Sequence, residues 1–229
     1  MAIWDSILLS SSEEANRLDA EYFDPRDLKL IQAISMAGGK PLGGQDGICK
    51  ILNGRTPQTY ALDGTAQVVR SGDLTSAFIY PGGGKSFLRA IRTPGMVNLK
   101  AGDVLISSIG MGSIGKISLV MEATDLVTVS EVTVLRDSKV FPEFLFCYLR
   151  TAAGQRQIIR EITGATGQQH LLKDKVARIV IPAPSDQLCD NLKAVLSKAW
   201  EEEKIAALNL PRAQELLLSE FPNAHGVLA

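Results

Sequence analysis

The stretch Gly102-Asp-Val-Leu-Ile-Ser-Ser-Ile-Gly-Met-Gly-Ser-Ile-Gly-Lys-Ile-Ser-Leu-Val-Met121 decides the fold, because it places a glycine-rich turn between two strand-forming runs. Its centre, Gly110-Met-Gly-Ser-Ile-Gly115, matches the dinucleotide fingerprint G-x-G-x-x-G letter for letter. That fingerprint requires a helix directly afterwards, whose N-terminus holds the pyrophosphate. The residues that follow, Lys116–Met121, are instead aliphatic and β-branched. The stretch therefore predicts a turn between two strands, and a nucleotide-binding enzyme is the alternative.

Strand-like runs continue on both sides of this stretch, and most of the chain's twenty glycines lie between residues 38 and 115. Short β-rich runs bounded by glycine are typical of a compact, turn-rich sheet domain. We expect strands at five places, namely Gln67–Arg70, Ala77–Tyr80, Asp103–Ser108, Gly115–Met121 and Val127–Leu135.

Helical patterns flank the sheet region. Asp24-Pro25 interrupts a helical pattern over residues 13–36. Because proline fits best at a first helical position, with a capping residue before it, this pattern predicts two helices with Asp24 as the second cap. Two more helices are expected at Glu143–Thr151 and 154–162, followed by a short strand at Ala177–Ile181.

A long helix is predicted over residues 186–208, with Ser185 as its cap and Pro211 ending or restarting it. Its apolar residues Leu188, Leu192, Val195 and Ala199 recur at spacings of four, three and four, as in a coiled-coil seam. Two heptads leave open whether this helix packs on its own domain or against a second chain. The whole pattern predicts an α+β fold. A compact twisted-sheet domain with flanking helices would span residues 1–184, and a helical region of coiled-coil type would span 185–229.

Composition and motifs argue against several function classes. The three cysteines are odd in number and far apart, which indicates a reducing cytoplasm and predicts neither a disulfide framework nor a metal site. The N-terminus lacks the features of a signal peptide, and no run is long enough to cross a membrane. Gly82-Gly-Gly-Lys-Ser86 resembles the end of a phosphate-binding loop, but Ile79 stands where the first glycine belongs. With two histidines and no nucleophile elbow, we expect no catalytic residues and no cofactor.

Charge is unevenly distributed along the chain. The net charge is −1, but residues 40–120 carry nine basic and four acidic side chains. A basic region within a near-neutral chain is suited to a phosphate-facing surface of limited extent.

Several segments, read in order, resemble the target-recognition half of a type I restriction-modification specificity subunit. They are Arg17–Phe23, Ile51-Leu-Asn-Gly-Arg-Thr-Pro57, Val69-Arg-Ser-Gly-Asp-Leu74, Gly102–Ser107, Gly112-Ser-Ile-Gly-Lys116, Gly164–Leu171 and Ile181-Pro-Ala-Pro184 with Gln187. The resemblance implies a subunit without catalysis that reads double-stranded DNA and directs modification subunits, and possibly a restriction subunit, to the target. Full-length members carry two target domains, so this chain would be a half-size subunit or a fragment.

Candidate DNA-binding residues follow from these segments, because arginine and lysine suit phosphate or guanine and glutamine suits adenine. We expect contacts from Arg55, Thr56, Gln58, Arg70, Ser71, Lys85, Arg89, Arg92, Ser113, Lys116, Gln168 and Gln169. The alternative for each cation is a solvated surface charge. Asp73 is more suited to capping a turn than to meeting DNA, and His170 to a structural role.

The C-terminal helix suggests how one such chain could read a whole site. Residues 186–208 would span roughly 35 Å as a helix, about one turn of DNA. Two copies joined through Leu188, Leu192, Val195 and Ala199 would present two recognition domains to a split, symmetric target. The same helical region, residues 185–229, would also dock the methyltransferase. A different class of function also stays open, namely a regulator or decoy that binds the methyltransferase without reading DNA.

Overall fold

The computed structural model describes residue 19 and residues 21–81, 87–110, 112–164 and 169–220. The first half of this part runs α2 (Pro25–Met36), β1 (Lys40–Pro41), β2 (Lys50–Asn53), β3 (Ala66–Val69), the short 3-10 helix η1 (Ser71–Thr75), β4 (Phe78–Ile79), β5 (Leu88–Ala90), β6 (Val97–Asn98) and β7 (Val104–Ser107). The second half runs β8 (Ile117–Val120), β9 (Leu126–Thr128), β10 (Val132–Arg136), α3 (Pro142–Arg150), α4 (Ala152–Glu161), α5 (Lys173–Val176), β11 (Val180–Ile181) and α6 (Asp186–Glu220).

Two sheets form the body of the molecule. The larger has five strands in the order β2-β10-β7-β8-β4, and the smaller has four in the order β5-β3-β9-β6. The decisive stretch forms the antiparallel pair β7–β8, with Leu105 opposite Ser118, so the predicted strand–turn–strand is confirmed. Two pairs are parallel, β3 with β9 and β4 with β8. Strands β1 and β11 form a separate two-stranded pair.

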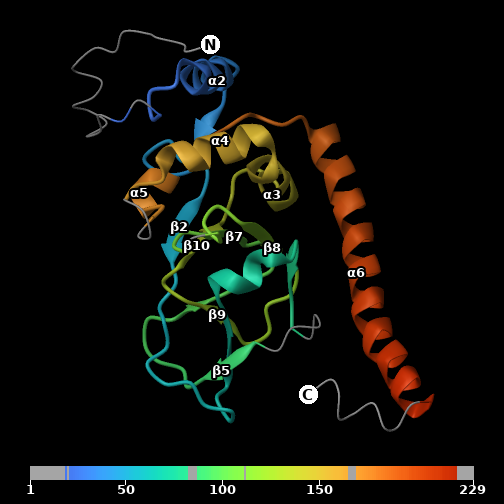
Figure 1. Ribbon diagram of the computed structural model, residues 1–229. Helices are drawn as coiled ribbons and strands as arrows, with labels where there is room; N and C mark the ends of the chain where they lie inside the picture. Colours follow the sequence, from blue (N-terminus) through green and yellow to red (C-terminus); the bar gives the residue numbers. More distant parts are fainter. Residues whose placement is uncertain (1–18, 20, 82–86, 111, 165–168, 221–229) are drawn as a thin grey trace.

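The five-stranded sheet is buried on both faces. Along β7, Val104 and Ile106 belong to a core shared with the helices, whereas Leu105 between them belongs to a second core shared with the four-stranded sheet. Alternate side chains of a strand point to opposite faces, so one strand supplies both cores. Figure 1 shows the resulting order, with α2, α3, α4 and α5 on one side of the larger sheet and β5 and β9 on the other. The predicted α+β class is confirmed.

The helices begin largely where their caps predict. Asp24 accepts a hydrogen bond from the backbone N–H of Arg26, and Pro25 is the first residue of α2. Ser185 Oγ accepts from the N–H of Leu188 at the start of α6, at 3.3 Å. Helices α3 and α4 lie close to the two ranges predicted for them, whereas the one-turn helix α5 has no counterpart in the prediction.

Two predictions about elements are wrong. The run Val127–Leu135 is two strands, because the chain leaves the four-stranded sheet after Thr128 and enters the five-stranded sheet at Val132. Helix α6 does not break at Pro211 but continues to Glu220. A proline removes only its own N–H donor, so the helical bonds on either side of it can persist.

The first turns of α6 pack on the body of the same chain. Cys189 is buried in the core beneath the helices, and Leu192, Leu196, Ala199 and Trp200 pack against that core. Of the predicted seam, Leu192 and Ala199 therefore face the chain's own domain, while Leu188 and Val195 are exposed. Figure 1 shows α6 running along the side of both sheets.

Candidate nucleic-acid interface

Several predicted contact residues meet at one end of the two sheets, where β3, β7 and β9 finish; we call it the turn end. In the parallel pair, Val69 lies beside Thr128, so Arg70 and Val129 leave their strands together. Thr128 Oγ1 donates to the carbonyl of Val69 at 2.9 Å, which ties the two strand ends. The backbone N–H of Arg55 donates to the Thr128 carbonyl at 3.1 Å. Three separate segments therefore converge here.

A hydroxyl group and a carboxylate contact Thr56 at the turn end. Its Oγ1 lies 2.8 Å from Ser130 Oγ and donates to Glu131 Oε2 at 3.4 Å. Gln58, two residues further on, is exposed. Exposed hydroxyl and amide groups can both donate and accept hydrogen bonds, which is the chemistry needed at the edges of DNA bases.

Arg70 and Ser71 lie at the start of η1. The backbone N–H of Arg70 donates to Asp73 Oδ2 at 2.8 Å, and the N–H of Asp73 donates back to the Arg70 carbonyl at 2.9 Å. Asp73 thus caps this turn, as its sequence position predicts. Its carboxylate also lies 3.6 Å from Arg70 Nε, so part of the Arg70 charge is compensated within the protein.

The β7–β8 turn, residues 108–116, lies at the same end. The N–H of Ser108 donates to the carbonyl of Glu131 at 2.8 Å. Ser113 Oγ donates to the carbonyls of Ile109 and Gly110, which closes the turn. Gly115 has φ of +82°, a conformation that favours glycine, and a Cβ there would lie a tight 3.3 Å from Ile158 Cγ2. Lys116 follows directly, half-buried at the start of β8.

The loop that carries Gln169 joins the turn end through backbone hydrogen bonds. Thr163 and His170 pair with each other at 2.9 and 2.8 Å, and the N–H of Leu171 donates to the Ser108 carbonyl at 2.8 Å. Gln169 itself is exposed. His170 contributes to this arrangement through its backbone. Two predicted contacts, Lys85 and Gln168, lie outside the described residues.

Arg89 and Arg92 lie towards the other end of the four-stranded sheet. Arg89 is on β5, and its Nε donates to the carbonyl of Gly64, before the start of β3, at 2.8 Å. Arg92 pairs with Asp125, before the start of β9, at 3.0 Å and also bonds Asn98. The structure thus brings Arg55, Thr56, Arg70, Ser71, Ser113, Lys116 and Gln169 to one end and separates Arg89 and Arg92 from them.

The sequence profile of a family described as "Type I restriction modification DNA specificity domain" matches residues 44–196. This match covers well over half of the chain. The chain belongs to this family. The matched range contains both sheets, the turn end, α3 to α5 and the first turns of α6.

Solved structures are similar to this specificity-domain chain at low sequence identity, and the two with a TM-score above 0.5 share its fold. The type I restriction-modification S subunit from M. genitalium is 14% identical, with a TM-score of 0.52, over 81% of this chain and 48% of that one. The type IIG restriction endonuclease BpuSI is 10% identical, with a TM-score of 0.58, over 76% of this chain and 28% of that one. The HsdS subunit from Thermoanaerobacter tengcongensis is 19% identical, with a TM-score of 0.48, over 90% of this chain and 50% of that one. No curated protein sequence matches the chain. The chain thus spans about half the length of the solved specificity subunits.

The described residues hold no group of three or more His, Cys, Asp or Glu side chains placed to bind a metal ion. None of the helices in this part of the chain combines the length and apolar character needed to span a bilayer.

Two polar residues of the specificity domain escaped prediction although they contact the β7–β8 turn. Arg150, the last residue of α3, donates from Nη1 to the carbonyl of Ile117 at 2.9 Å. Gln155 on α4 donates from Nε2 to the carbonyls of Gly115 at 3.1 Å and Leu149 at 2.7 Å. The contacts with Ile117 and Gly115 join segments more than thirty residues apart, so nothing in the local sequence marks them.

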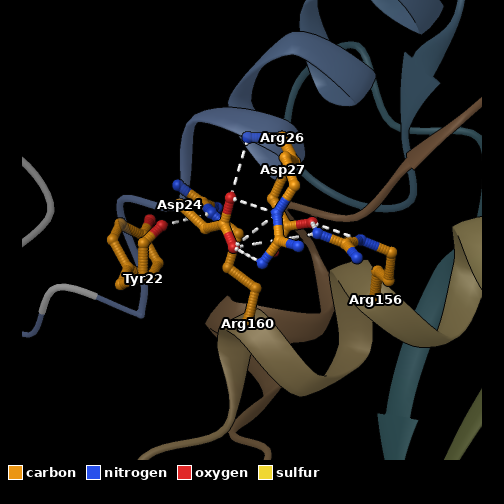
Figure 2. Close-up of polar contacts among 6 residues, drawn as sticks. All are labelled: Tyr22, Asp24, Arg26, Asp27, Arg156 and Arg160. Atoms are coloured by element: carbon orange, nitrogen blue, oxygen red, sulfur yellow. Dashed lines mark hydrogen bonds and ion pairs between the residues drawn. The ribbon is translucent and has the colours of Figure 1, made fainter. Parts of the chain in front are cut away.

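A cluster of arginines between α2 and α4 also escaped prediction; Figure 2 shows its contacts. Arg26 forms a fork with Asp24, with Nη2 at 2.5 Å from Oδ2. Arg156 on α4 bonds Asp27 through Nε at 2.5 Å and lies 3.9 Å from Asp24. Hydrogen bonds from Arg26 lower the pKa of Asp24 to about 2, well below its ordinary value near 3.8.

Arg160 completes this arginine cluster. Its guanidinium stacks over the ring of Tyr22 at 3.7 Å, its Nε donates to the Tyr22 carbonyl at 2.8 Å, and its Nη1 pairs with Glu161 at 2.7 Å. Each of the three arginines has a carboxylate partner. The contacts of Arg156 with Asp27 and of Arg160 with Tyr22 fasten the N-terminal segment to α4. A compensated cluster has little charge left to attract DNA phosphates.

Proposed function

We propose that this chain reads part of a DNA target sequence and directs separate modification subunits, with or without a restriction subunit, to that target. The observation that carries the proposal is that the specificity-domain match coincides with the part of the chain that gathers cations, hydroxyls and amides at the turn end. The chain itself would be non-catalytic, with methyl transfer performed by the modification subunits.

Within this proposal the turn end divides into two kinds of contact. Arg55, Arg70 and Lys116 would hold phosphates, supplying affinity that falls as salt rises. Thr56, Gln58, Ser71 and Gln169 would read base edges, and Ser113 would fix the shape of the turn that approaches the backbone. These side chains are exposed or half-buried on short, hydrogen-bonded turns, which hold them in place before DNA arrives.

Neutralising two cations of the turn end tests this function. We expect Arg55→Gln with Arg70→Gln to weaken binding of a random-sequence duplex roughly tenfold or more, because phosphate contacts dominate non-specific affinity. Fluorescence anisotropy measures that affinity, and a pull-down with the modification subunits checks that the complex still forms. The matched variant, Arg89→Gln with Arg92→Gln, removes the same charge at the other end of the sheet and should lose less affinity. If the chain were instead a regulator or decoy that does not read DNA, the unmodified chain would bind the modification subunits but would not bind a DNA duplex.

We further propose that two copies pair through α6, so that two domains read two halves of a site. Leu188 and Val195 are 43% and 65% exposed, and Ile205 and Leu208 are exposed further along the same helix. A helix of 35 residues extends about 50 Å, long enough to link two domains across a turn of DNA. A chain that matches about half of the M. genitalium S subunit would supply one recognition domain per copy.

Light scattering at micromolar concentration tests the pairing. The unmodified chain should have the mass of two copies, and Leu188→Glu with Val195→Glu should have the mass of one. Lys193→Glu, an exposed change on the same helix, should leave the larger mass intact. A single-chain mass for the unmodified protein would contradict the dimer while leaving the DNA-reading proposal standing.

A further inference from the structure

A small cationic notch lies where the helical layer meets the β7–β8 turn. It is an open cavity of about 360 Å³, and its polar lining comes from Thr75, Lys116, Arg150 and Gln155. Thr75 is the last residue of η1, which starts beside Arg70. The notch is therefore continuous with the turn end, and it adds a residue from α3 to that surface.

The two cations of the notch differ from the other candidates in what surrounds them. Among the residues that the structure describes, neither Lys116 nor Arg150 has a carboxylate within ion-pair distance. Arg70 and Arg92, by contrast, are paired with Asp73 and Asp125. Two neighbouring uncompensated positive charges repel each other and attract an anion.

Arg150 is held in position while keeping donors available. Its Nη1 is bound to the Ile117 carbonyl, and its guanidinium lies 5.2 Å from the centre of the Phe146 ring. A guanidinium carries five N–H donors in a planar fork, so one bond to a carbonyl leaves several that can reach a phosphate. In the described part of the chain, Nη1 is the one nitrogen of this guanidinium with an acceptor.

The turn beside the notch is held in shape by the same elements. Gln155 binds the Gly115 carbonyl, and Gly115 adopts a left-handed conformation that brings Lys116 to the start of β8. The backbone of Lys116 and the guanidinium of Arg150 are thus each held by hydrogen bonds. Cations carried on held segments suit a phosphate group better than cations on mobile segments would.

We propose that Lys116 and Arg150 together bind one backbone phosphate of the DNA, so that α3 supplies a contact to the DNA surface. This inference rests on the proposed DNA-reading function and deepens it. The contact is independent of sequence: it would set the position of the duplex on the turn end and leave base readout to the neighbouring loops.

Salt titration of DNA binding tests the notch. For Lys116→Gln with Arg150→Gln, we expect affinity for a random-sequence duplex to fall roughly five- to tenfold, and the slope of log affinity against log salt to become shallower by about one. The matched control, Lys29→Gln with Lys193→Gln, removes the same charge at exposed positions on α2 and α6 and should leave the slope unchanged.

Two further variants protect the test against a folding defect. Arg150→Lys keeps the charge and should restore most of the affinity lost in Arg150→Gln. Lys116→Gln alone removes a side chain without a hydrogen bond in the described structure and should still make the slope shallower. If the double variant binds like its control, the notch proposal is wrong and the DNA-reading proposal stands. If the unmodified chain binds no duplex even at low salt, both are wrong.

Discussion

The arginine cluster between α2 and α4 and the notch beside the β7–β8 turn use positive charge in opposite ways. In the cluster, Arg26 and Arg156 bind Asp24 and Asp27, and Arg160 binds Glu161. In the notch, Lys116 and Arg150 have no carboxylate partner among the described residues, and Arg150 is held by a backbone carbonyl. The cluster therefore joins parts of the chain, and the notch offers charge to a ligand. An arginine's role depends on its partners, and contacts such as Arg156 with Asp27 and Arg150 with Ile117 join residues that are far apart in the sequence.

A cation paired with a buried carboxylate should give the largest loss of stability. Arg136 binds Asp103, which is 2% exposed, through Nε at 2.8 Å and Nη2 at 2.6 Å, and the bond raises the pKa of Arg136. Arg136→Gln would leave a buried carboxylate without its cation, so we expect the free energy of unfolding to fall by about 3 kcal/mol. Urea denaturation measures it. A loss below 1 kcal/mol would show that pairing with a carboxylate does not mark the cations that stabilise the fold of this molecule.

A smaller loss of unfolding free energy is expected when a glycine of the turn beside the notch is replaced. Gly115→Ala places a Cβ 3.3 Å from Ile158 Cγ2 at φ of +82° and should cost about 2 kcal/mol of unfolding free energy. Gly112 has φ of +78° with open space around it, so Gly112→Ala should cost about 1 kcal/mol. Equal losses in urea denaturation would mean that packing against α4 does not hold the turn.

The glycine turn could be predicted from neighbouring residues, but contacts between segments far apart in the sequence could not. The strands around Gly110–Gly115 and the caps Asp24 and Ser185 depend on neighbouring residues, so the sequence could indicate them. The break inside Val127–Leu135 escaped notice because an unbroken β-rich run crosses from one sheet to the other. The candidate site was predicted in part for the same reason. Lys116 was predicted because it lies in a recognisable turn, whereas Arg150 was not, because its contact Ile117 is thirty-three residues away in the sequence.

The arginine cluster should affect stability without affecting DNA affinity. Arg156 is 40% exposed and binds Asp27, so Arg156→Gln should lower the free energy of unfolding by about 1 kcal/mol. The slope of DNA affinity against salt should be unchanged, unlike that of the notch variant. A shallower slope in the anisotropy titration would assign this arginine to the DNA surface and remove the distinction between the two regions.

The smallest expected effect is a pH dependence in the same cluster. The pKa of Asp24 is held at about 2, below its ordinary value, by hydrogen bonds from Arg26. A lowered carboxyl pKa stabilises the fold above about pH 4, and this contribution disappears as pH falls towards 2. Asp24→Asn, which keeps a capping acceptor, should therefore show a shallower fall in Tm over that range than the unmodified chain. The exposed change Asp46→Asn should leave the Tm profile unchanged. A profile for Asp24→Asn identical to that of the unmodified chain would contradict a lowered pKa for Asp24.

Selection from a random duplex library tests most directly whether the turn end reads DNA sequence. The purified chain, with or without its modification subunits, is incubated with random duplexes, and the bound fraction is sequenced over several rounds. We expect one short motif to be enriched, and the enrichment to be lost when Thr56, Gln58 and Gln169 are changed to alanine while affinity for random duplex is largely kept. Binding with no motif enriched, or a motif that survives these changes, would contradict sequence reading at the turn end.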